Sequence, residues 1–270
     1  MTALIMGIVN ATPDSFSDGG SFDGPADAIA HGRLLRSQGA SIIDIGGEST
    51  RPGAERVPVE VELQRVLPIV AALAADEVTV SIDTMNARTA LAAVEAGASI
   101  VNDVSGGLAD PELLGAVAET GADIVLGHWR GPSADMYARA EYVQIGREVA
   151  GELLERVQAA QAAGIPPSRI VVDPGIGFAK NAEQNWALLE SIGDIVALGH
   201  RVLLGTSRKR FLGDVLGPEA SIERRDFATA VTSVLADAAG VWVVRVHDVA
   251  STRDALGVAG AWKSGARGLP

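Results

Sequence analysis

Polar and ionisable side chains stand directly after eight short apolar runs of this chain. In chain order they are Asn10; residues 46–53 (GGESTRPG); Asp83; Asn102 and Asp103; His128; residues 173–175 (DPG); residues 206–210 (TSRKR); and Arg245 with His247. A single polar residue in such a position is often only a loop start or a helix cap, as we expect for Asp110 before Pro111. Eight in succession indicate instead that the runs end at one shared site.

Three of these residues form a set that suits a flat nitrogen heterocycle. Asp83, Asn102 and Asp173 come from the ends of the third, fourth and sixth runs. A carboxylate can accept two parallel hydrogen bonds from the edge of an amino-pyrimidine, and an amide donates and accepts in one plane. The set therefore predicts a binding floor for such a ring.

A second set is basic and suits a phosphate or pyrophosphate group. It consists of Arg51, Lys209, Arg245 and His247, with Asn10 opposite. The chain has a formal net charge of −12, so a local excess of positive charge favours an anion site over general solvation. Arg208 and Arg210 flank Lys209 and fit a solvated helix face equally well.

The apolar runs have the length and β-branched content of buried strands. They cover residues 4–9, 41–45, 78–82, 99–104, 123–126, 169–172, 201–204 and 241–246. Stretches with helical spacing lie between them, at residues 25–38, 59–75, 86–96, 111–120, 141–163, 182–198 and 222–239. Most of these stretches stop at a glycine, as helices commonly do.

Eight strand-then-helix units in 270 residues predict an α/β fold, a (β/α)8 TIM barrel, with residues 1–270 in a single domain. In this fold the chemistry lies at the carboxyl ends of the strands. A doubly wound parallel sheet is the alternative. It usually has fewer repeats and a glycine-rich fingerprint at its first turn, and GIGFAK at residues 175–180 lacks the third glycine.

The composition is that of a soluble globular enzyme, with 47% hydrophobic and 21% charged residues. Its acidic balance argues against nucleic-acid partners and against adsorption to anionic membranes. The absence of cysteine excludes disulfides, thiolate metal sites and cysteine nucleophiles. No signal-peptide pattern precedes Asn10 and no apolar run reaches about 18 residues, so we expect a cytoplasmic protein.

Seven motifs run from the first strand to the last. They are NATPDSFSDGG (10–20), DIGGESTRPGA (44–54), SIDT (81–84), NDVSGG (102–107), DPGIGFAK (173–180), GTSRKRFLG (205–213) and RVHDV (245–249). In type and order they closely resemble the motifs of the dihydropteroate synthases of bacterial folate synthesis. The resemblance covers essentially the whole chain.

The resemblance implies a transferase that moves an alkyl group other than methyl. Such an enzyme condenses a dihydropterin pyrophosphate with 4-aminobenzoate and forms dihydropteroate and pyrophosphate, with Mg²⁺ as cofactor. It also implies a homodimer, for which the apolar faces of the last helices, such as residues 231–239, are the expected contact. Sulfonamides mimic 4-aminobenzoate and are expected to compete with it.

The resemblance further assigns the site residues. Those implied to hold the pterin are Asp83, Asn102, Val104, Asp173, Gly205 and Lys209, of which Asp83, Asp173 and Lys209 would be catalytic. Those implied to hold the pyrophosphate are Asn10, Arg51, Arg245 and His247, and Asn10 would also ligate the metal ion. Those implied to surround 4-aminobenzoate are Thr50, Arg51, Pro52, Phe178 and Ser207. The loop at residues 11–20 is expected to close over the site.

One position departs from the family pattern. Relatives often carry Met directly before the histidine of the fifth strand, whereas this chain has Gly127 before His128. The missing side chain either widens the pterin pocket or is replaced by the ring of Trp129. His128 itself is either a neighbour of the ligand or a hydrogen-bonded histidine of the barrel, and we favour the second.

Two other functions remain open on the same barrel. A pterin-dependent methyltransferase would share the pterin-binding Asp and Asn residues but would need no pyrophosphate contacts. A non-catalytic paralogue would be expected to lose one or more of Arg51, Ser207, Lys209 and Arg245, and all four are present.

Overall fold

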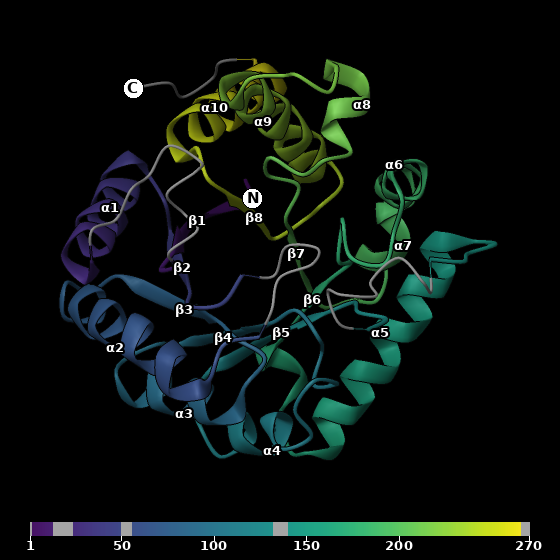
Figure 1. The fold of residues 1–270 in the computed structure, drawn as a ribbon. Coiled ribbons are helices and arrows are strands. Elements are labelled where there is room, and N and C mark those ends of the chain that lie inside the picture. The colour runs from purple at the N-terminus through teal and green to yellow at the C-terminus, as the bar shows by residue number, and fades with distance from the viewer. Residues whose placement is uncertain (1, 13–23, 50–55, 132–139, 266–270) are drawn as a thin grey trace.

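Eight parallel strands form a closed barrel in the computed structural model, which describes residues 2–12, 24–49, 56–131 and 140–265 (Figure 1). The strands follow one another around the barrel in chain order, and the last pairs with the first. They are β1 Leu4–Asn10, β2 Ile42–Gly46, β3 Thr79–Asp83, β4 Ile100–Asp103, β5 Asp123–Gly127, β6 Ile170–Asp173, β7 Arg201–Leu204 and β8 Val243–Val246. The predicted (β/α)8 barrel is confirmed, and the doubly wound sheet is wrong.

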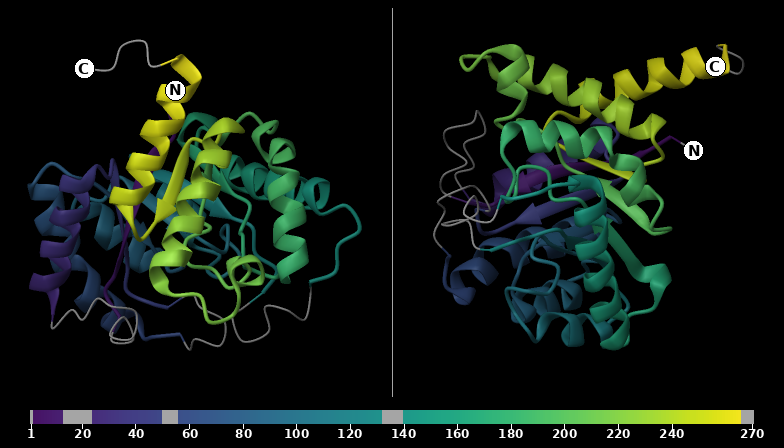
Figure 2. Two further views of the ribbon diagram at one scale, coloured as in Figure 1. Left: turned by 90° about the horizontal axis from the view of Figure 1, so that it is seen from above. Right: turned by 90° about the vertical axis from the view of Figure 1, so that its right-hand side faces the viewer.

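Helices cover the outside of the barrel (Figures 1 and 2). They are α1 Pro25–Gln38, α2 Val59–Ala75, α3 Ala87–Glu95, α4 Leu113–Ala118, α5 Ile145–Ala162, α6 Ala182–Glu190, α7 Ile192–Val196, α8 Leu212–Leu216, α9 Ile222–Ala238 and α10 Val249–Ser264, with a short 3-10 helix, η3, at Pro167–Arg169. The first two have the predicted bounds. No helix within the described ranges is long and apolar enough to span a bilayer.

Two of the predicted helices are wrong in their extent. The stretch 182–198 is interrupted at Ser191, because the Ser191 hydroxyl donates to the carbonyl of Ala187 at 2.9 Å and competes with the helical pattern. The stretch 141–163 becomes helical only at residue 145. The Glu148 carboxylate accepts the backbone N–H groups of Val143 and Gln144 at 2.7 Å each and so caps the helix there.

A layer of apolar side chains fills the barrel below the ends of the strands. It comprises Met6, Ile42, Ile100, Val125, Val171, Leu203 and Val243, all buried. A second and larger apolar cluster lies between the strands and the surrounding helices. The barrel is therefore packed, and polar side chains gather only above this inner layer, at the carboxyl ends of the strands.

Candidate active site

The pairing of the strands brings the predicted polar residues into one ring. Asn10 of β1 stands beside Gly46 of β2, Gly46 beside Asp83 of β3, and Asp83 beside Asn102 of β4. On the other side of the barrel Asp173 ends β6 and pairs with Gly127 of β5. Parallel register in a closed barrel thus confirms that the strand ends converge.

Arg245 of β8 crosses this ring and pairs with two carboxylates. Its Nε lies 2.6 Å from Oδ2 of Asp44, and its Nη2 lies 2.8 Å from Oδ2 of Asp83. The same oxygen of Asp44 accepts a hydrogen bond from Nδ2 of Asn102 at 3.1 Å. A fully buried aspartate in β2 therefore links Arg245 to Asn102, and Arg245 in turn links them to Asp83.

Asp44 is a site residue that the pattern of strand ends does not reveal. It lies inside the apolar run Ile42-Ile43-Asp44-Ile45, before β2 ends at Gly46. The signal that could have found it is the carboxylate itself, since a charged residue in a buried strand needs a partner.

Burial shifts the pKa values of the charged residues on the binding floor. It raises the pKa of Asp83 to about 7; Arg245 opposes this shift, and the neighbouring Asp44 adds to it. Burial also raises the pKa of Asp173, against the opposing charge of Lys209. Burial works against the charge on Arg245 as well, but Asp44 and Asp83 together raise its pKa. The two buried carboxyl groups of the floor, Asp83 and Asp173, therefore bind a proton more readily than exposed aspartates do.

Lys209, Asp173 and Phe178 lie together on the β6 and β7 side. The Lys209 ammonium donates to the carbonyl of Ile176 and lies 5.0 Å from the centre of the Phe178 ring. Burial lowers the pKa of Lys209 to about 8, although Asp173 opposes that shift. An Asp173 carboxylate oxygen accepts the backbone N–H of Gly175 at 2.8 Å, which fixes the start of the loop.

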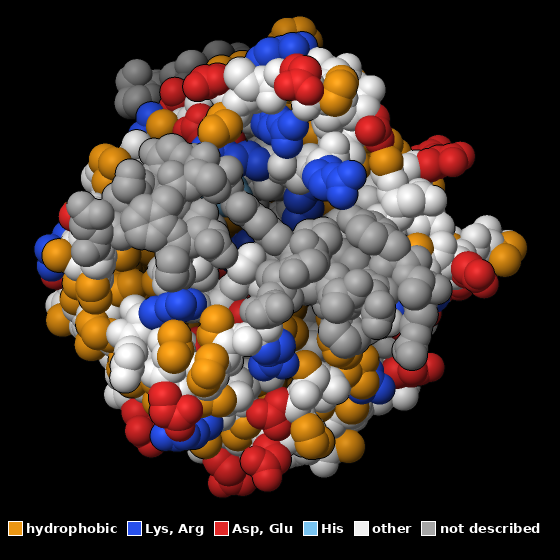
Figure 3. Space-filling model, in the orientation of Figure 1, with side chains coloured by type: hydrophobic (Ala, Val, Ile, Leu, Met, Phe, Trp, Pro, Cys, Tyr) orange, Lys and Arg blue, Asp and Glu red, His pale blue; other side chains and the backbone are white. Residues whose placement is uncertain are grey.

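Ser207 and His247 meet where β7 and β8 end. Ser207 Oγ lies 2.8 Å from Nδ1 of His247 and also accepts the His247 backbone N–H at 3.1 Å. Gly205 leaves room beside them, since a Cβ there would lie 3.8 Å from Cβ of Arg245 and 4.0 Å from Nζ of Lys209. Lys and Arg side chains gather around the hollow at the barrel mouth (Figure 3).

The arginines that flank Lys209 have separate roles. Arg208 pairs with both carboxylate oxygens of Asp226 on α9, at 2.7 and 2.8 Å. Arg210 is exposed. Asp103 also turns away from the pocket, because its carboxylate accepts the N–H groups of Ser105 and Gly107 and shapes the loop after β4.

Gly127 neither widens the pocket nor leaves a space for Trp129. A Cβ at Gly127 would lie 2.5 Å from the carbonyl oxygen of Val104, so the backbone of Val104 takes that space. The backbone of Val104, a predicted pterin contact, therefore packs directly against β5. His128 is a buried, hydrogen-bonded histidine as favoured, with Glu152 at 2.9 Å from Nε2. Thr50, Arg51, Pro52 and residues 13–20 of the expected closing loop lie outside the described residues.

Comparison with known proteins points to the same family that the sequence motifs resemble. The chain matches the family model for pterin binding enzymes over residues 6–247. A dihydropteroate synthase of Mycobacterium leprae is 51% identical over 263 residues, which cover 96% of this chain and 93% of the relative. The structure of Xanthomonas albilineans dihydropteroate synthase with 4-aminobenzoic acid has a TM-score of 0.89 and 43% identity, covering 100% of this chain and 94% of that chain.

A second structure of the Xanthomonas albilineans enzyme, in complex with 7,8-dihydropteroate, has a TM-score of 0.85 and 40% identity, covering 100% of this chain and 95% of that chain. The fold and the ring of polar strand ends thus define a pterin binding enzyme on a (β/α)8 barrel. Within that class the chain belongs to the dihydropteroate synthase family.

Proposed function

We propose that this protein condenses 6-hydroxymethyl-7,8-dihydropterin pyrophosphate with 4-aminobenzoate and releases 7,8-dihydropteroate and pyrophosphate. The observation that carries the proposal is the arrangement of Asp83, Asn102 and Asp173 on one floor, with Arg245 paired to Asp83 at 2.8 Å. This floor offers acceptors to the amino-pyrimidine edge of a pterin, and cations stand beside it for the diphosphate. Lys209 and Gly205 flank the space for the ring.

The reaction begins with loss of pyrophosphate in an SN1-like step. The bond between the pterin methylene carbon and the bridging oxygen breaks, and the electron pair leaves with pyrophosphate. The resulting cation is delocalised into the ring, where the carboxylates of Asp83 and Asp173 stabilise it. Arg245 and His247 bind the departing anion.

A magnesium site fits the residues around Gly46. A Cβ at Gly46 would be in ordinary contact with Asp83 Cβ at 3.7 Å and with Asn10 Oδ1 and Asp83 Oδ2 at 3.8 Å each, so two side-chain oxygens lie close to Gly46. No group of three or more His, Asp or Glu residues in the described ranges is arranged to hold a metal ion. Mg²⁺ is commonly bound through one or two protein oxygens together with substrate phosphates, so Asn10 would hold it on the pyrophosphate. Bound there, Mg²⁺ supplies charge neutralisation for the leaving group.

The second substrate then attacks the cation. Phe178 and Ser207 line the space that we assign to 4-aminobenzoate, with Ser207 at the end for the carboxylate. The aromatic amine is neutral at pH 7, so its nitrogen attacks the methylene carbon without a dedicated general base and then releases its proton. Exclusion of water matters, because water would trap the same cation.

We also propose that the protein is a homodimer that acts in the cytoplasm. Large apolar side chains are exposed along α9 and α10, which pack against each other at one side of the barrel (Figures 1 and 2). They are Phe227, Val231, Leu235, Val258 and Trp262. A second copy that covers this face would remove it from water.

The test is direct. Purified protein is incubated with the dihydropterin pyrophosphate, 4-aminobenzoate and Mg²⁺, and dihydropteroate and pyrophosphate are measured together. Equal amounts of both products are expected. Bound substrate without product would favour the non-catalytic paralogue, and binding of a methylated folate without any response to pyrophosphate would favour the methyltransferase.

A further inference from the structure

We propose that Lys180 is a positioning residue, whose side chain holds the loop after β6 so that Phe178 and Lys209 face the two substrates. The inference rests on the proposed synthase reaction, in which Phe178 contacts 4-aminobenzoate and Lys209 the pterin. Lys180 itself is 1% exposed. Its ammonium therefore contacts neither substrate, although it lies within one short loop of both pockets.

Every donor of the Lys180 ammonium has an acceptor. Its Nζ lies 3.0 Å from the carbonyl oxygen of Gly175, 2.9 Å from that of Phe178 and 2.9 Å from Nδ1 of His128. An ammonium group has three N–H donors, so the group is fully used. Two of the three bonds go to the backbone of the loop, which makes the lysine its internal support.

Lys209 contacts the same loop from the pocket side. It donates to the carbonyl of Ile176, and its stem packs on Gly177, where a Cβ would lie 3.1 Å from Lys209 Cδ. The carbonyls of Gly175 and Phe178 therefore face Lys180, while the carbonyl of Ile176 faces Lys209. A shift of the loop away from Lys180 would move Lys209 and the Phe178 ring together.

The loop adopts a backbone that its surroundings must impose. Ala179 has φ of +50°, a conformation that residues with side chains rarely adopt. Tyr142 donates from its hydroxyl to the Ala179 carbonyl at 3.1 Å, next to the residue that carries the buried ammonium. Gly175 packs so closely on His128 that a Cβ would lie 2.2 Å from the His128 carbonyl oxygen.

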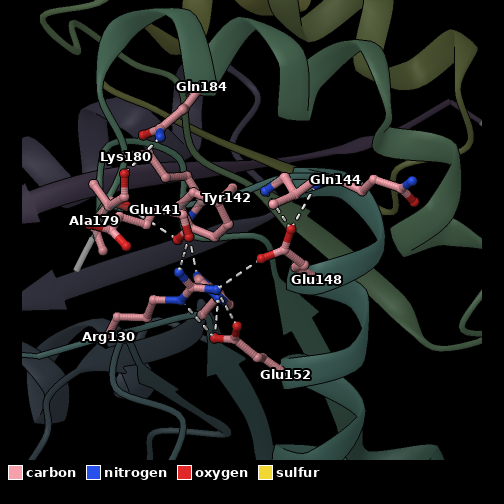
Figure 4. A network of polar contacts seen from close by, with 12 residues as sticks. Arg130, Glu141, Tyr142, Gln144, Glu148, Glu152, Ala179, Lys180 and Gln184 are labelled. Atoms are coloured by element: carbon pink, nitrogen blue, oxygen red, sulfur yellow. Dashed lines mark hydrogen bonds and ion pairs between the residues drawn. The ribbon is translucent and has the colours of Figure 1, made fainter.

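A chain of polar contacts leads from Lys180 to the surface. Nε2 of His128 lies 2.9 Å from Glu152, Glu152 pairs with Arg130, and Arg130 lies 3.9 Å from the centre of the Tyr142 ring. Figure 4 shows Arg130 between Tyr142 and Glu152, with Ala179 and Lys180 nearby. Because Tyr142 also donates to the Ala179 carbonyl, these contacts lead from Lys180 back to the same loop.

The protonation states along this chain follow from burial and from the neighbouring charges. Burial lowers the pKa of Lys180 to about 7, although Asp173 opposes that shift. Burial, with the charge of Lys180, lowers the pKa of His128 to about 4, so the imidazole is neutral near pH 7. Burial works against the Glu152 anion, but His128 and Arg130 lower its pKa to about 2. A neutral His128 accepts from Lys180 at Nδ1 and donates from Nε2 to the anionic Glu152. His128 thereby links the buried cation to a carboxylate.

The experiment compares Lys180→Met with wild type in the full chain, under steady-state conditions with each substrate varied. We expect the KM for 4-aminobenzoate to rise about tenfold, with a smaller change in the KM for the pterin substrate. Lys263→Met is the matched control, because Lys263 is an exposed lysine on α10 and its loss is expected to leave both constants unchanged.

Two further proteins keep the test decisive if Lys180→Met folds poorly. Tyr142→Phe removes only the hydroxyl on the Ala179 carbonyl and should raise the same KM by about two- to threefold. The chain has no cysteine, so Lys180→Cys can be aminoethylated in denaturant at that one position and refolded. Restoring an amine there should bring the KM back toward wild type.

The outcomes separate the two proposals. A wild-type protein that makes no dihydropteroate refutes the proposed function. An active wild type whose Lys180→Met variant keeps both KM values, or loses only kcat and is not restored by aminoethylation, refutes the positioning role of Lys180.

Discussion

Asp83 lies on the pocket floor with a pKa that burial raises to about 7. The anionic form accepts the N–H donors of the pterin and stabilises the cation, so kcat/KM should fall as the pH drops below about 7. Asp83→Asn should lower kcat/KM about 10²- to 10³-fold and remove this acidic limb. Arg245 stays paired with Asp44 in the variant. A pH–rate profile of both proteins checks this. Because burial also raises the pKa of Asp173, the outcome that would contradict it is an acidic limb in Asp83→Asn with the same midpoint as in the wild type.

Gly127 is the second residue whose substitution has a definite structural consequence. A Cβ there would lie 2.5 to 2.7 Å from three backbone atoms of Val104. Gly127→Ala should displace this backbone, lower the free energy of unfolding by about 1–3 kcal/mol and weaken binding of the pterin substrate. Thermal unfolding and calorimetric titration measure the two effects.

Gly115 supplies the control for that substitution. It lies in α4, and a Cβ at this position would meet nothing within 4 Å. Gly115→Ala should therefore stabilise the helix by up to about 1 kcal/mol and leave binding unchanged. Equal behaviour of the two alanine variants would show that Val104 does not depend on Gly127.

Residues at the strand ends could be predicted, whereas their partners could not. Asn10, Asp83 and Asp173 are visible because each directly follows an apolar run, and Asn102 because it lies near the end of one. The pairing of Arg245 with Asp44 joins residues 201 positions apart, and no local pattern specifies it. The direction of each side chain depends on the closed barrel, which has to be known first.

Among the elements, α9 is held to the loop after β7 by the Arg208–Asp226 ion pair and by hydrogen bonds of Thr206 to Thr232 and of the Arg208 N–H to Thr229. Arg208 reaches both oxygens of Asp226 and has φ of +58°. Arg208→Met should cost about 1–3 kcal/mol in unfolding free energy and raise the KM for 4-aminobenzoate, because Ser207 and Lys209 flank it. Chemical denaturation and kinetics check both changes. Arg224→Met, an exposed arginine on the same helix, should change neither, and a neutral Arg208→Met would contradict the role of this ion pair.

Elements with strong periodicity could be predicted in full. The bounds of α1 and α2 follow from their spacing, and so does the position of every strand to within two residues. Neither α8 nor α10 could be predicted in this way. Five residues give α8 too little pattern, and the glycines at 257 and 260 in α10 lower its helix propensity. Tertiary contacts supply what the local sequence lacks there.

At the scale of the whole molecule, closure of the barrel brings the carboxyl ends of eight separate strands together at one mouth. The repeat of strand and helix determines this convergence, which is why the meeting of the strand ends could be predicted before any contact was known. The outer surface follows no such repeat. Among the described residues, several large exposed apolar side chains lie on α9 and α10, where Trp262 is 88% exposed.

The dimer is the last prediction. Phe227, Val231 and Leu235 stand four residues apart and so form one stripe along α9. Phe227→Asp combined with Leu235→Lys should convert the dimer to a monomer, because a charge at each position would lose its hydration in the interface. Sedimentation velocity at several protein concentrations measures the change. Val143→Asp is the control, since Val143 is 95% exposed before α5 and should leave the dimer intact. A wild-type chain that sediments as a monomer throughout would refute the proposal.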